Sequence, residues 1–488
     1  MIAGKRQSGF ATFAAMAVVA LSMMCTLSVA MAQTGSGPIT NASNGLEGTW
    51  QGTVSDGRTE LKVIIELKRS GTDFSGSFQV PDRSADILPM STVTVADRSL
   101  RFTFDVPTVW WEGRLNDEGT RLEGKWSNGV STFPLNFART AAPPSVKTRV
   151  QDPKKPYPYD DKQVRFENRA AQISLAGTLT LPKTAGPFAA VILMGGAGRI
   201  DRDGTLYGHH PFLVLADNLT RRGIAVLRVD DRGVGESGGN AESATIDDYA
   251  SDLEAAIAYL KTRPDIDRKR LGLIGYGEGG CIVPVITAHS SSLALAVLIA
   301  GVGVDGKHTL SARSDLAVKP VGAVEEEIKA LRRLEIRCLS IMGGIANPEA
   351  ATSALRSAIA TEIAPIPAGR RQRALQEMVA ITSSFNTPWM RSFIGYDPVP
   401  LLKRTTCPVL LVHGDHDMEM AADLHLSSEE AALKASGNMA VTSATIKLAN
   451  HMMQPCKTGL PDEYEAIEQT FSADALKTIG EWIELRVK

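Results

Sequence analysis

Short alternating runs of apolar and polar residues fill the chain after about residue 45. Such period-2 runs put successive side chains on opposite faces of a strand. Turn pairs such as Ser70-Gly71 separate them. The runs are Leu61–Leu67, Phe74–Val80, Ser91–Val95, Leu100–Val106, Thr108–Leu115, Leu122–Trp126 and Ser131–Phe137. Seven or eight strands at this spacing predict a small all-β domain over residues 45–140, either a barrel or a sandwich.

Four tryptophans, Trp50, Trp110, Trp111 and Trp126, lie in this region. They could line a ligand cavity. We expect them to pack in the core instead, because large rings dominate the buried area of a small domain.

The pattern changes after a proline-rich segment, residues 141–160, which is typical of a semi-rigid linker. Beyond it, strand-like runs alternate with stretches of helical pattern. The predicted strands are Gln163–Glu167, Gln172–Leu181, Ala189–Met194, Ile224–Val229, Arg270–Ile274, Ala294–Ile299, Val409–His413 and Thr445–Leu448. The predicted helices are Pro211–Arg222, Ile246–Arg263, Gly279–His289 and Ser472–Arg486. Several strands are continuous apolar runs, as in a parallel sheet covered on both faces. Residues 161–488 are therefore expected to form a doubly wound α/β domain with an antiparallel start.

A long insertion of helical pattern, about residues 318–393, separates the sixth and seventh core strands. It leaves the sheet at the carboxyl end of a strand, where α/β folds bind ligands. We expect it to form a helical cap over the site.

The first 32 residues have the pattern of a signal peptide. Lys5 and Arg6 precede a mostly apolar run, residues 10–29, and Ala30-Met31-Ala32 forms a cleavage site. An uncleaved membrane anchor is the alternative. Polar residues within the run favour cleavage, which predicts a periplasmic or secreted protein. No later segment reaches the ~20 apolar residues that cross a bilayer, so no membrane association is expected after cleavage.

Composition narrows the class of partner. The chain has 488 residues, enough for more than one domain, and a formal net charge of −2. That charge gives no reason to expect a nucleic-acid partner. Four cysteines remain after the signal segment, too few for a disulfide framework. A Cys407–Cys456 bridge is conceivable, but we do not expect it, because the two lie at different ends of the predicted sheet. Neither a metal nor a cofactor is expected.

The most informative segment is residues 271–280. An apolar strand, Leu271–Ile274, runs into Gly275-x-Gly277-x-Gly279. In the nucleophile elbow G-x-S-x-G, the glycines allow a sharp strand-to-helix turn that presents a serine. Here the central position is Gly277, which has no oxygen to attack a carbonyl. The segment has the form of an elbow without its nucleophile.

Two further residues follow in the order that a hydrolase of this architecture requires, acid and then histidine. Asp417 lies in the loop after strand Val409–His413, and His451 follows strand Thr445–Leu448. Asp415 and His416 are nearby alternatives for the acid and the histidine, but we expect them to be solvated loop groups. We therefore predict that Asp417 and His451 form an acid–histidine pair.

An oxyanion hole would use two backbone N–H groups. The residue after the nucleophile position, Glu278, would supply one. Ala197 or Gly198, in the glycine-rich loop after strand Ala189–Met194, would supply the other.

A literal G-x-S-x-G match, Gly235–Gly239, places Ser237 at its centre. It lies several residues beyond the preceding strand, and no helix follows until about Ile246. Because an elbow needs an immediate strand–turn–helix, we expect Ser237 to be a loop residue and not a nucleophile.

The region 160–488 resembles the bacterial EstD-type esterases of the α/β-hydrolase superfamily, which are related to serine aminopeptidase-like hydrolases. The matching blocks are Gly196–Gly198, Asp201–Asp203, His210–Phe212, Arg221–Arg228, Asp230–Gly235, the elbow, Asn450-His451 and Lys457–Gly459. The resemblance implies the α/β-hydrolase fold with a helical cap, ester hydrolysis, and Asp417 and His451 as acid and base. The β domain resembles an accessory domain found before such hydrolases.

At the elbow this family has Gly-His-Ser-Glu-Gly-Gly, whereas this chain has Tyr276 and Gly277 in place of histidine and serine. Tyr276 is expected to point into the turn, and Cys281, one helical turn past the tip, is expected to be buried, so we expect neither to replace the serine. The sequence therefore predicts a degenerate esterase that binds a small-molecule ester or acyl ligand. The alternative is slow hydrolysis by a water that Asp417 and His451 activate. A third reading, an engineered or erroneous residue at 277, is weakened because position 276 departs as well.

Overall fold

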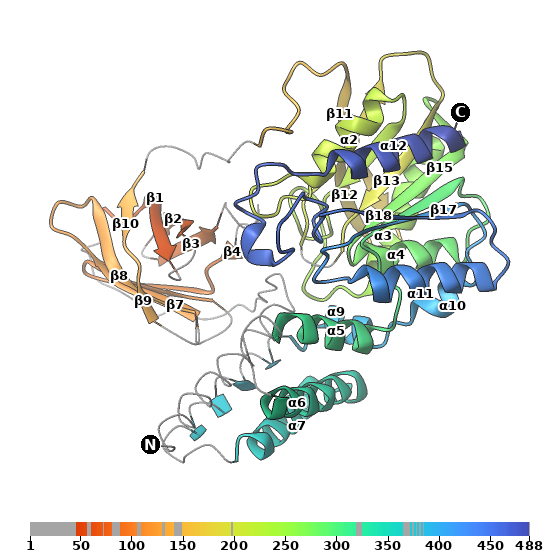
Figure 1. Cartoon of the computed structure of the whole chain (residues 1–488). Coiled ribbons are helices and arrows are strands. Elements are labelled where there is room, and N and C mark those ends of the chain that lie inside the picture. Colours follow the sequence, from red (N-terminus) through yellow and green to blue (C-terminus); the bar gives the residue numbers. More distant parts are fainter. Residues whose placement is uncertain are drawn as a thin grey trace. The chain divides into compact units, whose positions relative to one another are not determined.

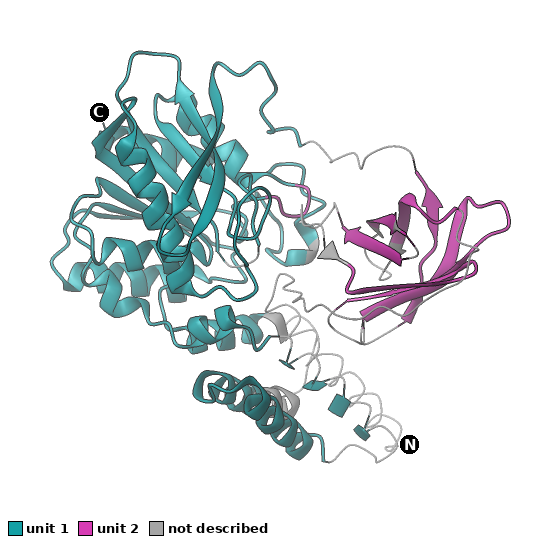
Figure 2. Cartoon of the chain, turned by 180° about the vertical axis from the view of Figure 1, so that it is seen from behind, with its two compact units in different colours: residues 1–26, 149–204, 209–488 teal, residues 27–148, 205–208 magenta. Residues whose placement is uncertain are grey.

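The computed structural model describes residues 45–55, 60–71, 73–80, 88–104, 109–128, 132–140, 149–196, 199–318, 325–364, 371–372, 375–376, 378–379, 382–383 and 385–487. The predicted signal segment, residues 1–32, lies outside these residues. The chain divides into two compact units, which Figure 2 shows in different colours. Of the described residues, one unit comprises those from 45 to 140 together with 205–208, and the other those of 149–204 and 209–487. We describe each unit by itself.

The smaller unit contains one antiparallel sheet in which ten strands are described, with β9 branching from β8. The strands are β1 (Gly48–Ser55), β2 (Glu60–Ser70), β3 (Asp73–Gln79), β4 (Leu88–Pro89), β5 (Thr92–Ala96), β6 (Ser99–Thr103), β7 (Val109–Leu115), β8 (Arg121–Asn128), β9 (Thr132–Pro134) and β10 (Phe137–Arg139). Their order is β4-β3-β2-β1-β10-β8-β7-β6-β5. Strands β3 and β5, which lie near opposite ends of this strand order, contact each other. The sheet is therefore a nearly closed barrel rather than a sandwich.

The predicted strand Ser131–Phe137 is wrong in detail. The chain forms two short strands there, β9 and β10, and Leu135 and Asn136 lie between them. Pro134 has no N–H to continue a ladder, and the Asn136 side chain instead accepts a hydrogen bond from the Gly124 amide.

The tryptophans divide between core and surface. Trp50 and Trp111 are fully buried, and their indole N–H groups donate to the carbonyls of Leu46 and Leu135. Trp126 packs against the same core. Trp110 departs from the prediction. The pleat turns it to the opposite face of β7 from Trp111, where the cationic groups of Arg101 and Lys125 lie over its ring.

The larger unit is built on an eight-stranded sheet in the order β11-β12-β14-β13-β15-β16-β17-β18. The strands are β11 (Tyr159–Asn168), β12 (Ile173–Pro182), β13 (Phe188–Met194), β14 (Ala225–Val229), β15 (Ile266–Tyr276), β16 (Leu295–Ile299), β17 (Val409–Gly414) and β18 (Val441–Ile446). The first two pairings are antiparallel and those from β14 to β18 are parallel. This confirms the predicted α/β fold with an antiparallel start.

Helices cover this sheet on both faces (Figure 1). Helices α2 (Pro211–Arg221) and α12 (Ala473–Val487) pack on each other, while α3 (Ile246–Thr262) packs on α4 (Gly279–Thr287) and α11 (Ala422–Ala435) lies against β17 and β18. The continuous apolar strands are buried between these layers. As a result, the loops that leave the strands' carboxyl ends are positioned by a rigid core.

Strand boundaries differ from the prediction by up to four residues, most at β11, β15 and β18. β18 ends at Ile446 and not at Leu448, whose backbone is left-handed with φ 52°. β18 is the edge strand of the sheet and is half exposed. It therefore contains few apolar residues, and the apolar pattern placed the predicted strand too close to its carboxyl end. β15 begins at Ile266, four residues before the predicted start. Its first part was not recognised because residues 267–270 are polar and partly exposed.

The described part of the insertion between β16 and β17 consists of helices joined by loops and turns. It contains α5 (Gly306–Val318), α6 (Glu325–Gly344), α7 (Pro348–Glu362), α9 (Pro388–Ile394) and α10 (Pro398–Leu402). Helices α5, α6 and α9 contact one another, and α10 contacts α4. The helical region thus begins before the predicted residue 318 and brings α5 to the end of the sheet.

Candidate active site

The segment predicted to be an elbow turns directly from strand β15 into helix α4. Gly277 lies at the tip with φ 57°, a left-handed backbone that residues with a Cβ rarely adopt. Its amide donates to the carbonyl of Ile299 on β16 (2.8 Å), and its carbonyl accepts from Gly280 (2.9 Å). This strand–turn–helix with a left-handed residue at its tip is the geometry of a nucleophile elbow.

Space for a side chain exists at Gly277 and at none of the neighbouring glycines. A Cβ added at Gly275 would lie 2.6 Å from a backbone oxygen, and one at Gly279 would lie 2.3 Å from another. At Gly277 the Cβ would meet, among the described residues, only His451, at 3.2 Å from Nε2 and 3.6 Å from Cε1. The tip of the elbow therefore faces the histidine predicted to be the base.

Asp417 and His451 form the predicted pair. His451 Nδ1–H donates to Asp417 Oδ2 at 3.0 Å, and Oδ1 is 3.2 Å away. The Asp417 carboxylate is fully buried and also accepts from the amides of Glu419 (2.8 Å) and Met420 (2.7 Å). These bonds fix the carboxylate behind the ring and leave His451 Nε2 directed at Gly277.

Burial and charge set the protonation of the pair. Burial disfavours ionisation of Asp417, but the charge of His451 and its hydrogen bonds lower its pKa to about 2. Burial also disfavours the imidazolium, yet the charges of Asp417 and Glu419 outweigh it and raise the pKa of His451 to about 9. At neutral pH the pair is an ion pair with a proton on Nε2.

This pKa makes the stability of the fold depend on pH through His451. Since its folded pKa lies above the unfolded value of about 6.5, the stabilisation is complete below that value and is lost as pH rises through about 9. The free energy of unfolding of wild type minus that of His451→Gln should fall by roughly 2–3 kcal/mol between pH 6 and pH 10 in urea titrations. The same difference in free energy of unfolding at pH 6 and pH 10 would contradict a raised pKa for His451.

A buried arginine that the sequence did not reveal joins the turn to the acid loop. Arg313 of α5 lies with Nη1 3.3 Å from Glu278 Oε1, and its Nε–H donates to the Glu419 carbonyl at 3.2 Å. Glu419 also accepts from the Tyr464 hydroxyl at 3.2 Å. Burial raises the pKa of Glu278 although Arg313 opposes it.

The other candidates are placed as follows. Glu278 precedes α4, as the predicted oxyanion role requires, while Ala197 and Gly198 lie outside the described residues. Asp415 and His416 contact each other at 2.7 Å and are about one-third exposed. The Tyr276 hydroxyl donates to the His451 carbonyl at 3.0 Å.

The cysteines give no substitute nucleophile in the part of the chain that is described. Cys281 is fully buried, and that burial raises its thiol pKa well above the ordinary value. Cys407 and Cys456 are both free. Over the same residues there is no group of three or more metal-type side chains arranged to hold an ion, and no helix long and apolar enough to span a bilayer.

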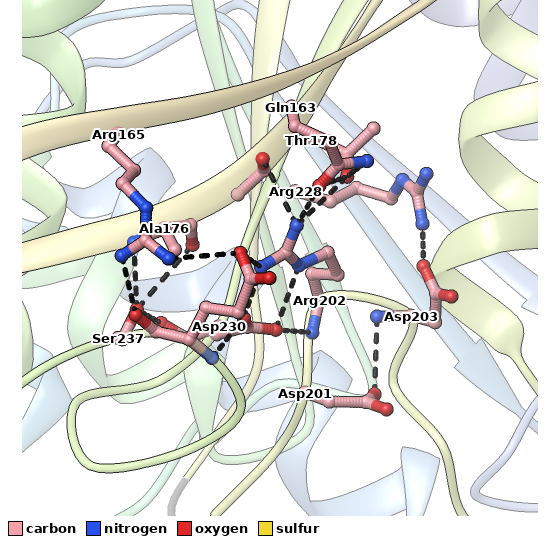
Figure 3. A network of polar contacts seen from close by, with 12 residues as sticks. Gln163, Arg165, Ala176, Thr178, Asp201, Arg202, Asp203, Arg228, Asp230 and Ser237 are labelled. Carbon is pink, nitrogen blue, oxygen red and sulfur yellow. Dashed lines mark hydrogen bonds and ion pairs between the residues drawn. The ribbon is translucent and has the colours of Figure 1, made fainter.

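Ser237 makes hydrogen bonds with backbone groups and does not lie in a strand–turn–helix elbow. Its hydroxyl donates to the Asp230 carbonyl (2.8 Å) and accepts from the Ala176 amide (2.9 Å). Figure 3 shows it within a network in which Arg202 and Asp230 pair. The hydroxyl fastens the loop after β14 to strand β12, which explains its burial.

Replacing Ser237 tests this structural role. Ser237→Ala removes two buried hydrogen bonds and should lower the free energy of unfolding by about 1–3 kcal/mol, measured by urea titration. Ser243→Ala, at an exposed position in the same region, is the matched control and should change it by less than about 0.5 kcal/mol. If Ser237→Ala and Ser243→Ala both left the free energy of unfolding nearly unchanged, the structural role of Ser237 would be contradicted.

Comparisons with known proteins support the fold. Residues 210–340 match the family model described as serine aminopeptidase, S33. Esterase EstD of Thermotoga maritima is 26% identical over 290 residues, 59% of this chain and 60% of that protein. The larger unit thus has the α/β-hydrolase fold, and its sequence is similar to this family model and to EstD. Its elbow carries glycine at the position where such an elbow presents a serine.

Two further similarities cover a shorter stretch of the chain or have lower identity. The uncharacterized protein PA2218 of Pseudomonas aeruginosa is 32% identical over 126 residues, 25% of this chain and 32% of that one. The solved structure of the Pyrococcus furiosus esterase Pf2001 aligns with a TM-score of 0.41 at 15% identity, over 68% of this chain and 92% of that one. The chain spans less than two-thirds of the length of EstD and of PA2218.

Proposed function

We propose that this protein is an exported, esterase-like α/β hydrolase that has lost serine catalysis and binds a small-molecule ester or acyl ligand. The observation that carries the proposal is Gly277, which stands at the tip of an intact elbow with His451 Nε2 3.2 Å from the position of a Cβ. The name of the relative EstD supports the esterase-like class. The pattern of residues 1–32 supports export.

Loss of the serine removes the covalent step of the reaction. In a complete triad the nucleophile and base act as a unit, and removing the serine costs about 10⁶ in turnover. What remains at such a site is positioning and oxyanion stabilisation. Both act on a bound acyl group without cleaving it, which is why the proposal is binding.

The second candidate function is slow hydrolysis by a water in front of His451. The open space at Gly277 favours it, because a water there would lie within reach of Nε2. The base form of His451 is needed, and its pKa of about 9 leaves it mostly protonated at neutral pH. Any such rate should therefore rise with pH through about 9.

The rate on a short p-nitrophenyl ester, measured for purified wild type and His451→Ala, tests the proposal. We expect equal rates at pH 7 and no burst of nitrophenol. A wild-type rate that disappears in His451→Ala and rises through pH 9 would favour the water mechanism. A burst of nitrophenol would show a covalent intermediate and overturn the proposal.

A further inference from the structure

The turn that carries the acid is held by two buried basic side chains. Asp417 Oδ1 accepts from the amides of Glu419 (2.8 Å) and Met420 (2.7 Å). The carbonyls of these two residues are also hydrogen-bonded. Arg313 Nε–H donates to the Glu419 carbonyl at 3.2 Å, and His413 Nδ1–H donates to the Met420 carbonyl at 3.3 Å. Four hydrogen bonds therefore fix the two residues whose amides hold the acid.

One peptide group, between Glu419 and Met420, joins Arg313 to the acid. Its carbonyl accepts from the guanidinium, and its N–H donates to Asp417 Oδ1. Linked hydrogen bonds polarise one another, and a charged donor makes the stronger bond. The guanidinium therefore strengthens the hydrogen bond that the Met420 amide donates to the carboxylate, and it fixes the direction of that bond.

The orientation of Arg313 is itself fixed. The residue belongs to α5, the first helix of the insertion, and its side chain is only 8% exposed. Its Nη1 lies 3.3 Å from Glu278 Oε1, and its Nη2 lies 3.8 Å from Glu419 Oε2. Because a guanidinium is planar, contacts with three of its nitrogens determine its orientation. One buried side chain thus connects the elbow, the acid turn and the insertion.

We propose that Arg313 is a positioning residue for the Asp417–His451 pair: it holds the Glu419–Met420 peptide so that Asp417 stays in line with His451 Nδ1. The helical insertion then helps to build the acid–histidine pair. The inference concerns the pair alone. It holds whether His451 faces a serine, a water or a bound ligand, so it goes beyond the proposed function and does not rest on it.

Arg313 acts on His451 in two ways that have opposite signs. As a positive charge it opposes the imidazolium and lowers the pKa of His451. As a positioning residue it keeps the Asp417 carboxylate against the ring, and that contact raises the same pKa. Arg313→Lys separates the two effects. Lysine keeps the charge, but its single ammonium group cannot reproduce the three directed contacts of the guanidinium.

NMR titration of the His451 ring in the purified full chain tests the inference. We expect Arg313→Lys to lower the pKa of His451 from about 9 to about 8, because the carboxylate is held less firmly. Arg332→Lys is the matched control, since Arg332 of α6 pairs with Asp315 of α5 at an exposed position, and it should leave that pKa unchanged. A merely structural role of Arg313 would lower the urea midpoint of unfolding without this change in pKa.

In wild type, exchange of the Arg313 Nε–H proton with solvent probes the same contact without a variant. It should be at least about 10-fold slower than exchange of the Nε–H proton of the exposed Arg332.

Three results would overturn the inference. They are an unchanged or higher His451 pKa in folded Arg313→Lys, an equal fall of that pKa in Arg332→Lys, or Arg313 exchange as fast as that of Arg332. If Arg313→Lys fails to fold, the exchange comparison in wild type decides. Neither measurement depends on whether the protein cleaves esters, so the proposed function can fail or hold separately.

Discussion

Gly277→Ser should turn this protein into a serine hydrolase. The new Cβ would lie 3.2 Å from His451 Nε2, so the hydroxyl is placed beside the base while Asp417 already orients the ring. A complete serine triad contributes about 10⁶ in turnover, and we expect the variant to regain on the order of 10²–10⁴ of it, because the base and acid are in place. Hydrolysis of p-nitrophenyl butyrate, followed by stopped-flow for the acyl-enzyme burst, measures it.

Gly277→Ala is the matched control, because it has the same strained backbone and no nucleophile. Both variants should lose about 1–2 kcal/mol of stability from a Cβ at positive φ. Only the serine variant should react with a fluorophosphonate, and its rate should rise with pH as His451 loses its proton. A serine variant that folds but stays as inactive as the alanine variant would show that the oxyanion groups no longer support acyl transfer.

Glu429→Ala should be the most destabilising single change near the site. His413, at the end of β17, donates through Nε2–H to Glu429 Oε2 (2.9 Å) and through Nδ1–H to the Met420 carbonyl (3.3 Å), and both side chains are fully buried. Two donating ring nitrogens mean a charged imidazolium. Burial opposes that charge, but Glu429 raises the pKa of His413. Removing the carboxylate leaves the buried charge of His413 without its partner, which should lower the free energy of unfolding by about 3–5 kcal/mol.

Urea unfolding of Glu429→Ala, compared with Glu430→Ala, measures this effect. Glu430 is the next residue of α11 and pairs with Lys434 at the partly exposed surface, so its loss should cost less than about 1 kcal/mol. The double variant His413→Leu/Glu429→Leu should be more stable than Glu429→Ala, since no charge is left buried. Equal losses for Glu429→Ala and Glu430→Ala would refute the buried ion pair.

The α/β fold was predictable because its buried strands are continuous apolar runs that alternate with helical patterns. Such signals are local, and they located seven of the eight strands with at most a few residues of error. They failed where burial is one-sided: β18 is an edge strand with few apolar residues, and the exposed start of β15 reads as a loop. In the β unit, alternation does not say which face is inside, so Trp110 was misplaced.

The site was predictable only in its chain order. Gly277, Asp417 and His451 could be found because each follows a strand whose carboxyl end lies at one edge of the sheet. Arg313 could not be found, because it reaches Glu278 from a helix of the insertion, and nothing local to α5 distinguishes it. Nor could the His413–Glu429 pair, since charged residues 16 positions apart give no sign of sharing a buried contact.

Fluorophosphonate labelling of the purified wild-type chain tests the central claim most directly. The account predicts that intact-mass spectrometry shows no adduct, while Gly277→Ser gains one adduct that maps to position 277. An adduct on a wild-type serine, at Ser237 or elsewhere, would show an activated nucleophile and contradict the account.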